Sequence, residues 1–194
     1  HTLLSGEKDY AWHPVHPKQE KQKPAVFRGY ARKTGRPGIR NELWILPTVG
    51  CVNDVAKALA SRAQGLTGGS VEGVYAFPHP YGCSQLGDDQ DNTRRALAAL
   101  ATHPNAGGVL LLGLGCENSG VEQIRPFMGD YDQQRVRFLV CQDCEDEIEA
   151  GMALLKELAE RMREDRRTDC GADQLTVGLK CGGSDGMSGI TATT

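Results

Sequence analysis

Short apolar runs that end in glycine and polar residues recur along the chain at intervals of about 30 residues. Each run is shorter than the roughly ten residues that a helix needs, so each is predicted to be a strand buried within a sheet. The central run, 108–112, is bounded by Gly107 and Gly113. The five predicted strands are 43–49, 71–77, 108–112, 135–140 and 175–179.

The stretches between these runs carry apolar residues at helical spacing. In 52–64, for example, Val55, Leu59 and Ala63 share one face. Asp91 is expected to cap the helix that it begins. Alternation of strands with helices indicates an α/β fold with a mostly parallel sheet of about five strands, covered by helices on both faces. The predicted helices are 52–64, 91–103, 121–128 and 143–167.

Residues 1–25 differ from the rest of the chain. Prolines and histidines stand there among Lys, Gln and Glu with little periodicity, which is typical of a linker or of an arm lying on a surface. We therefore expect the folded domain at 26–194. The chain begins at His1 instead of Met and ends soon after a Gly-Ser-Asp-Gly loop, so it is expected to be a fragment of a longer protein.

Composition narrows the class of protein. The 194 residues have a formal net charge of −3 and a pI of about 6.0, which gives no support for a nucleic-acid partner. No apolar stretch approaches the roughly 20 residues of a membrane span, so a cytoplasmic protein is expected. Seven cysteines spread over a chain with ample core residues predict free thiols or metal ligands in a reducing compartment.

The carboxyl ends of parallel strands meet at one edge of a sheet, so the residues that follow the five runs are expected to gather there. A single cysteine near a strand is usually a small buried hydrophobe. Here, however, four cysteines lie in or beside glycine-rich turns near predicted helix starts, where thiolate is favoured, and thiolates select iron, iron–sulfur clusters or zinc. These four are Cys51, Cys83, Cys116 and Cys181.

The polar residues at the same exits suit acid–base chemistry. His79 lies between two prolines, and histidine is the common general acid or base near neutral pH. Arg40 and Asn41 either belong to a solvated turn or bind a carboxylate, which the planar guanidinium fits. The glycines at 113 and 115 lack the third glycine of a nucleotide fingerprint, so no nucleotide is expected. Other exit candidates are Ser84, Gln85, Asp88, Asp89, Glu117, Asn118, Ser184 and Asp185.

Six longer motifs combine these residues. They are Gly-Arg-Pro-Gly-Ile-Arg-Asn (35–41), Pro-Thr-Val-Gly-Cys-Val-Asn (47–53), His-Pro-Tyr-Gly-Cys-Ser-Gln-Leu-Gly-Asp-Asp (79–89), His-Pro-Asn-Ala-Gly-Gly-Val-Leu (103–110), Gly-Leu-Gly-Cys-Glu-Asn (113–118) and Cys-Gly-Gly-Ser-Asp-Gly (181–186). In this order they resemble the altronate and galactarate dehydratase family of sugar-acid hydro-lyases. The sequence at 81–89 resembles the altronate branch more than the galactarate branch.

The resemblance implies a Rossmann-like three-layer sandwich that forms the middle domain, 26–194, of a longer dehydratase. Residues 1–25 would be the arm from a small preceding domain, and a C-terminal domain would follow. The implied enzyme converts an aldonic acid such as D-altronate into 2-keto-3-deoxy-D-gluconate and water, or acts on galactarate or another aldaric acid. The implied partners are the sugar acid and the rest of the polypeptide. A homo-oligomer is compatible with the resemblance, and the isolated fragment is expected to be inactive.

The resemblance also implies iron, as Fe²⁺ or an iron–sulfur cluster, bound by the four cysteines at 51, 83, 116 and 181. Removing a proton next to a carboxylate calls for a base and a Lewis acid, and loss of the hydroxyl calls for an acid. His79 and Glu117 are assigned to proton transfer. The expected substrate contacts are Arg40, Asn41, Asn53, Gln85, Asp88, Ser184 and Asp185.

Two other functions remain open. Cys141 and Cys144 form a CxxC, which is typical of a redox pair or half a zinc site, and a thiol module would use them as its working pair. A purely structural domain would leave all catalytic residues to the C-terminal domain.

Overall fold

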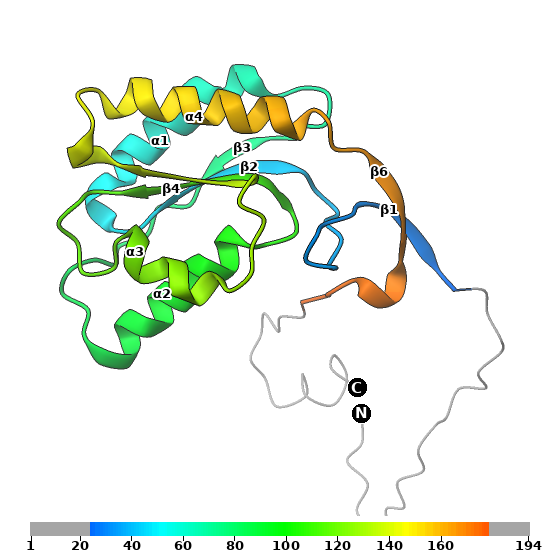
Figure 1. Cartoon of the computed structure of the whole chain (residues 1–194), viewed down its shortest axis with the longest axis horizontal. Coiled ribbons are helices and arrows are strands. Elements are labelled where there is room, and N and C mark those ends of the chain that lie inside the picture. The colour runs from blue at the N-terminus through cyan, green and yellow to red at the C-terminus, as the bar shows by residue number, and fades with distance from the viewer. Residues whose placement is uncertain (1–23, 179–194) are drawn as a thin grey trace, which may run out of the picture.

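The computed structural model describes residues 24–178, which form an α/β domain (Figure 1). Its centre is a four-stranded parallel sheet in the order β3-β2-β4-β5. The long strand β4 is buried along its whole length because helices cover both of its faces. The predicted α/β class and parallel sheet are confirmed. The strands are β2 (Glu42–Pro47), β3 (Val74–Ala76), β4 (Ala106–Gly113) and β5 (Val136–Val140).

Helices α1 and α4 cover one face of the sheet, and α2 and α3 cover the other (Figure 1). Alternate residues of each strand feed the two cores: Leu43 and Ile45 pack with α1 and α4, whereas Trp44 and Leu46 pack with α2. Among residues 24–178, no helix is long and apolar enough to cross a membrane. The helices are α1 (Asn53–Arg62), α2 (Gly87–Ala101), α3 (Val121–Ile124) and α4 (Glu147–Met162). Short 3₁₀ turns are η1 (Gly50–Val52), η2 (Ala63–Leu66), η3 (Arg125–Met128), η4 (Cys141–Asp143) and η5 (Ala172–Gln174).

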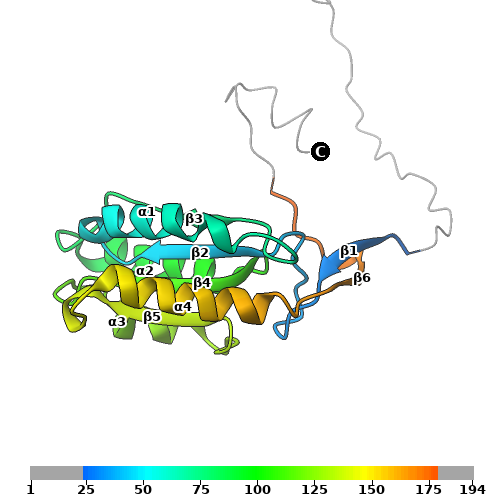
Figure 2. The same cartoon turned by 90° about the horizontal axis from the view of Figure 1, so that it is seen from above.

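A two-stranded antiparallel ribbon, which we call the neck, joins the two ends of the described chain. Strands β1 (Val26–Tyr30) and β6 (Arg167–Gly171) pair along their full length. The neck lies beyond the amino ends of the parallel strands (Figure 2). Glu72 connects it to the sheet, because its Oε1 accepts hydrogen bonds from the Tyr30 hydroxyl at 3.0 Å and from Arg167 at 2.6 Å. The chain therefore enters and leaves the domain side by side.

The prediction of a fifth parallel strand at 175–179 is wrong for the part that the structure describes. Residues 175–178 have no regular structure, and Leu175 and Val177 are 40% and 68% exposed. The prediction rested only on the apolar residues of this segment, and the fold leaves them exposed. The last strand is instead β6, whose polar residues Arg167, Thr168 and Asp169 gave no apolar run to recognise.

The predicted helix starts also needed correction. Helix α2 begins at Gly87, whose φ of 56° glycine adopts readily, so the chain turns into the helix four residues earlier than expected. Asp91 is therefore not the N-cap; it lies one turn inside and pairs with Arg94 at 3.0 Å. The helix with a side-chain cap is α4, where Asp146 accepts hydrogen bonds from the backbone of Ile148 and Glu149.

Candidate active site

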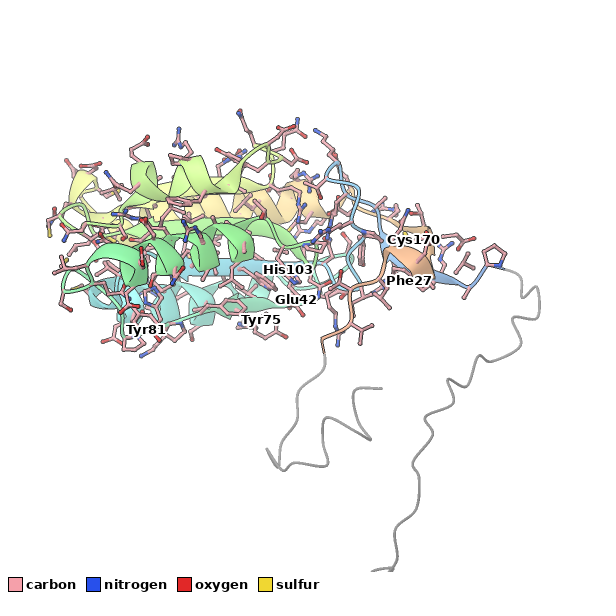
Figure 3. The ribbon with its side chains drawn as sticks, turned by 90° about the horizontal axis from the view of Figure 1, so that it is seen from below. Phe27, Glu42, Tyr75, Tyr81, His103 and Cys170 are labelled. Atoms are coloured by element: carbon pink, nitrogen blue, oxygen red, sulfur yellow. The ribbon has the colours of Figure 1, made fainter. Side chains whose placement is uncertain are left out.

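The loops that follow β2, β3, β4 and β5 meet at the carboxyl edge of the sheet, on the opposite side of the domain from the neck. Figure 3 shows Tyr81, in the loop after β3, far from Cys170 of the neck. Most of the predicted site residues lie in these loops or at the start of the helices that follow: Cys51, Asn53, His79, Cys83, Gln85, Asp88, Cys116 and Glu117. Cys181, Ser184 and Asp185 lie outside the described residues.

The loops after β2 and β3 are bound to each other through their backbones. The Asn53 amide donates to the His79 carbonyl at 2.8 Å and accepts from the His79 backbone N–H at 3.3 Å. The Gly50 N–H donates to the Tyr81 carbonyl at 2.8 Å. The predicted substrate contact Asn53 therefore uses its amide to hold the loop that carries His79.

The His79 ring is held in one tautomer. Its Nε2 lies 2.8 Å from the Pro47 carbonyl, which can only accept, so Nε2 carries the proton. Its Nδ1 accepts a longer hydrogen bond, 3.3 Å, from the Tyr81 N–H, and the two rings stack at 5.7 Å. The neutral imidazole thus has its basic nitrogen, Nδ1, in the weaker of the two contacts, which is the arrangement of a base with a fixed orientation.

Glu117 sits where β4 ends and holds the exits of the two central strands together. Its Oε1 accepts from the buried Thr48 hydroxyl at 2.6 Å and from the Leu114 N–H at 3.1 Å, and its Oε2 accepts from the Gly115 N–H at 2.6 Å. Burial raises the pKa of the Glu117 carboxyl, but these hydrogen bonds outweigh it and hold the pKa below its usual value. Glu117 is therefore an ionised acceptor.

A second set of contacts holds the loops after β3 and β4 together. The Asn118 amide donates to the Cys83 carbonyl at 3.1 Å. Arg94, on α2, donates to the Asn118 carbonyl at 2.6 Å and to the buried Ser119 hydroxyl at 3.1 Å. The loop of Cys83 and the loop of Cys116 consequently keep a fixed relation to one another.

The thiols differ in exposure. Cys51, Cys83 and Cys116 are exposed at the carboxyl edge, and the Gln142 amide points at Cys116 Sγ from 3.9 Å. Between residues 24 and 178, no three His, Cys, Asp or Glu side chains come close enough to hold one metal ion. The described thiols are thus suitable donor groups on neighbouring loops, but they do not by themselves form a metal site.

Cys141 and Cys144 are half-buried instead. Burial, with the nearby Glu147, raises the pKa of the Cys141 thiol to about 11. The Cys144 thiol donates to the Val140 carbonyl at 3.3 Å. A thiol that stays protonated at neutral pH is a poor nucleophile, so this geometry does not favour the redox interpretation of the CxxC.

The carboxyl edge is acidic, and three of the cations near it are paired with carboxylates. Three basic residues near this edge, on α1, α2 and η3, each make a salt bridge to a carboxylate three positions away, whereas Arg95, the next residue of α2, donates to Asn92 at 3.2 Å. These pairs are Lys57 with Asp54 at 3.0 Å, Arg94 with Asp91 at 3.0 Å and Arg125 with Glu122 at 3.3 Å. The described edge therefore offers acceptors, amides and thiols, while Lys57, Arg94 and Arg125 are paired with carboxylates.

Two open pockets border these loops. One, of about 620 Å³, lies between the loop after β3 and α2; His79 and Gln85 are on its wall, and its lining is mostly apolar. The other, of about 630 Å³, lies between the exits of β4 and β5 and is bordered by Glu117 and Cys144. Asp88 is exposed in the first turn of α2 and is not on the wall of either pocket.

Arg40 and Asn41 lie at the other edge of the sheet, because they precede β2. Asn41 is fully buried; its Oδ1 accepts from Arg32 at 2.7 Å, and its Nδ2 donates to the Ser70 carbonyl at 2.9 Å. The Arg40 side chain is exposed and lies 3.9 Å from Glu72. The structure does not bring either residue to the carboxyl edge, so it separates them from the other predicted substrate contacts.

Comparison with known proteins decides the family. Residues 29–163 match the family described as D-galactarate dehydratase/altronate hydrolase, second domain, and this match spans all four exit loops. The chain belongs to this family.

Relatives with known names give the same answer. The chain is 51% identical over 169 residues to an altronate dehydratase of Bacillus subtilis (strain 168), covering 86% of this chain and 34% of that protein. It is 53% identical over 165 residues to the altronate dehydratase of Escherichia coli (strain K12), covering 84% and 33%. It is 32% identical over 176 residues to the beta subunit of a (2R)-sulfolactate sulfo-lyase of Chromohalobacter salexigens, covering 88% and 41%. The chain spans about a third of the length of the two altronate dehydratases.

Three residues that hold the loops of this dehydratase-family domain were missed by the sequence prediction: Thr48, Tyr81 and Arg94. Thr48 and Tyr81 lie inside motifs that were recognised, at 47–53 and 79–89, but nothing in their spacing predicts contact with Glu117 or His79. Arg94 lies on a predicted helix, where an arginine is ordinarily solvated. Its contact with the loop at 118–119 depends on where α2 crosses the sheet.

Proposed function

We propose that this domain forms one wall of the active site of a sugar-acid dehydratase. The full-length enzyme would convert an aldonic acid such as D-altronate into 2-keto-3-deoxy-D-gluconate and water. The observation that carries the proposal is the family match across the exit loops, together with more than 50% identity to altronate dehydratases. The hydrogen bonds between the exit loops support the proposal, because they hold the predicted site residues in fixed positions.

His79 is our candidate for the base. Its Nδ1 would take the proton next to the substrate carboxylate, releasing the 3.3 Å contact with the Tyr81 N–H. The Pro47 carbonyl would stay bound to Nε2 and stabilise the imidazolium that forms. Gln85 lies on the same pocket wall and is our candidate for binding a substrate hydroxyl. Asp88, Ser184 and Asp185 stay predicted contacts.

The substrate carboxylate needs a cation, and three basic residues near the described edge already pair with the protein's own carboxylates. Lys57, Arg94 and Arg125 are each paired with a carboxylate. The missing positive charge would therefore come from a metal ion or from a part of the full-length protein outside residues 24–178. Iron bound by the cysteines at 51, 83, 116 and 181 stays a prediction; it would supply a Lewis acid.

A second candidate function is a structural domain whose reaction is carried out by the remainder of the polypeptide. The paired cations at the carboxyl edge favour this alternative, as does coverage of only a third of the altronate dehydratases. Galactarate or another aldaric acid is the alternative substrate, because the family includes galactarate dehydratases.

The test is an anaerobic assay of the full-length parent against a panel of aldonic and aldaric acids, with and without ferrous iron. We expect water loss from altronate, detected as the 2-keto product, and a higher rate with iron. Iron and acid-labile sulfide should be measured on the same protein after anaerobic purification. No turnover of any acid in the panel would contradict the proposed function, and turnover unaffected by removal of iron would contradict the metal.

A further inference from the structure

Each oxygen of the Glu117 carboxylate accepts a hydrogen bond from the protein's own donors. Three hydrogen bonds converge on it, from the Thr48 hydroxyl, the Leu114 N–H and the Gly115 N–H, at 2.6, 3.1 and 2.6 Å. A residue that transfers a proton to a substrate needs an oxygen directed at the reacting atom. Both oxygens of Glu117 are instead directed at the turn and at the neighbouring strand.

The backbone around Glu117 is shaped to accept this carboxylate. A side-chain carbon placed on Gly113 would lie 2.8 Å from Glu117 Oε1, so the strand end leaves just enough room for the carboxylate. Gly115 has a φ of 125°, a conformation that other residues rarely adopt, and its N–H is the donor to Oε2. The turn and the carboxylate therefore depend on each other.

We propose that Glu117 is a positioning residue that fixes the turn at 114–116 against the end of β2, and so sets where the Cys116 thiol is presented. It acts as a hydrogen-bond acceptor and does not transfer the proton that the sequence analysis assigned to it. Because Thr48 lies three residues before Cys51, the same carboxylate also fixes the loop of Cys116 relative to that of Cys51. The effect on turnover rests on the proposed function, whereas the effect on the turn does not.

Glu117→Gln is the direct test. Its side chain has nearly the same shape, but its NH₂ group must face a donor N–H or hydroxyl in either orientation, so at least one hydrogen bond is lost. Thr48→Val removes the hydroxyl partner, and Thr48→Ser keeps it. Glu122→Gln is the matched control, because Glu122 is exposed on α3 and pairs only with Arg125 among the described contacts.

Amide hydrogen exchange of the full-length protein measures how well the turn at 114–116 is held, and it does not require an active enzyme. In Glu117→Gln we expect the amide of Leu114 or of Gly115, whichever faces the NH₂ group, to exchange about tenfold faster, the scale of one hydrogen bond to an ionised group. Thr48→Val should show a similar increase, with near-native exchange in Thr48→Ser and in Glu122→Gln. Unchanged exchange at both Leu114 and Gly115 in Glu117→Gln would overturn the proposal, whatever the enzyme does.

Measurements of kcat and its pH profile then distinguish a positioning role of Glu117 from a role in proton transfer. We expect Glu117→Gln and Thr48→Val to lower kcat by similar factors, the double variant to be no worse than the worse single one, and both limbs of the pH profile to survive. A proton donor would behave differently: Glu117→Gln would abolish one limb, and Thr48→Val would leave kcat near wild type. That pattern would also overturn the proposal.

Discussion

The two edges of the parallel sheet differ in the side chains that bind their backbone groups. At the carboxyl edge, side-chain amides and carboxylates such as Asn53 and Glu117 bind backbone N–H groups. At the amino edge, arginines such as Arg32 and Arg135 bind backbone carbonyls. The difference follows from the βα units, because helices begin at the carboxyl edge with free N–H groups and end at the amino edge with free carbonyls.

The amino edge is the more deeply buried of the two. The Arg32 side chain is 2% exposed and donates to the Pro104 carbonyl at 2.8 Å, to Asn41 at 2.7 Å and to Asp165 at 3.2 Å. Arg135 is buried beside it; burial and the charges of Arg32 and Arg161 lower the pKa of Arg135 to about 9. Such groups fix the domain, whereas the exposed thiols of the other edge remain open to ligands. Stability and the proposed chemistry are thus separated along the strands.

The largest effect that we predict is a loss of stability when a buried arginine of the amino edge is replaced. Arg32→Met should lower the free energy of unfolding by about 3–5 kcal/mol, because it leaves Asn41 and the Pro104 carbonyl without their donor in a buried site. Asp165 keeps Arg161 at 3.4 Å, which places the loss toward the lower figure. Urea denaturation followed by circular dichroism measures it.

Arg28→Ala is the control for this experiment. Arg28 and Asp169 form a salt bridge whose side chains are 66% and 68% exposed, so its loss should cost less than about 1 kcal/mol. Equal losses in the two variants would mean that burial of Arg32 contributes nothing to stability.

The next largest effect is a loss of activity, caused by a substitution at the carboxyl edge that leaves the domain folded. His79→Ala in the full-length enzyme should lower kcat by about a hundredfold or more, the usual contribution of a positioned base. The thermal unfolding temperature should change little, since the Asn53 contacts to the backbone of residue 79 remain. A kcat close to wild type would remove His79 from the proposed mechanism. His103→Gln, at the amino edge, controls for the loss of a histidine.

The same comparison shows what the sequence could and could not predict. The strand β4 was predicted because it is buried on both faces and so reads as one apolar run. The gathering of Cys51, Cys83 and Cys116 at one edge followed from the parallel topology. The neck was not predictable, because β1 and β6 pair across about 140 residues and carry polar side chains. Nor did any local pattern distinguish the buried Arg32 from its exposed neighbours in the same basic segment.

A smaller effect tests the corrected helix starts at the carboxyl edge. Asp146→Ala removes the acceptor for the Ile148 and Glu149 N–H groups and should cost about 1 kcal/mol of stability. Asp91→Ala, at the position where the sequence predicted a cap, should cost less, because it removes only a partly exposed salt bridge to Arg94. The reverse order in urea denaturation would show that the sequence prediction had found the cap after all.

The smallest predicted effect separates the two kinds of thiol at the carboxyl edge. The pKa of Cys141 is raised to about 11 by burial and by Glu147, so at pH 8 nearly all of this thiol is protonated and slow to alkylate. Its reaction with iodoacetamide, followed by mass spectrometry, should accelerate as the pH rises from 9 toward 11, while Cys51 should react faster than Cys141 because its side chain is exposed. Cys141→Ser should leave kcat of the full-length enzyme within about twofold of wild type, since a protonated thiol supplies no nucleophile. Rapid alkylation of Cys141 at pH 7, together with a large loss of kcat, would restore the CxxC as a working redox pair and move the chemistry from the exits of β2, β3 and β4 to that of β5.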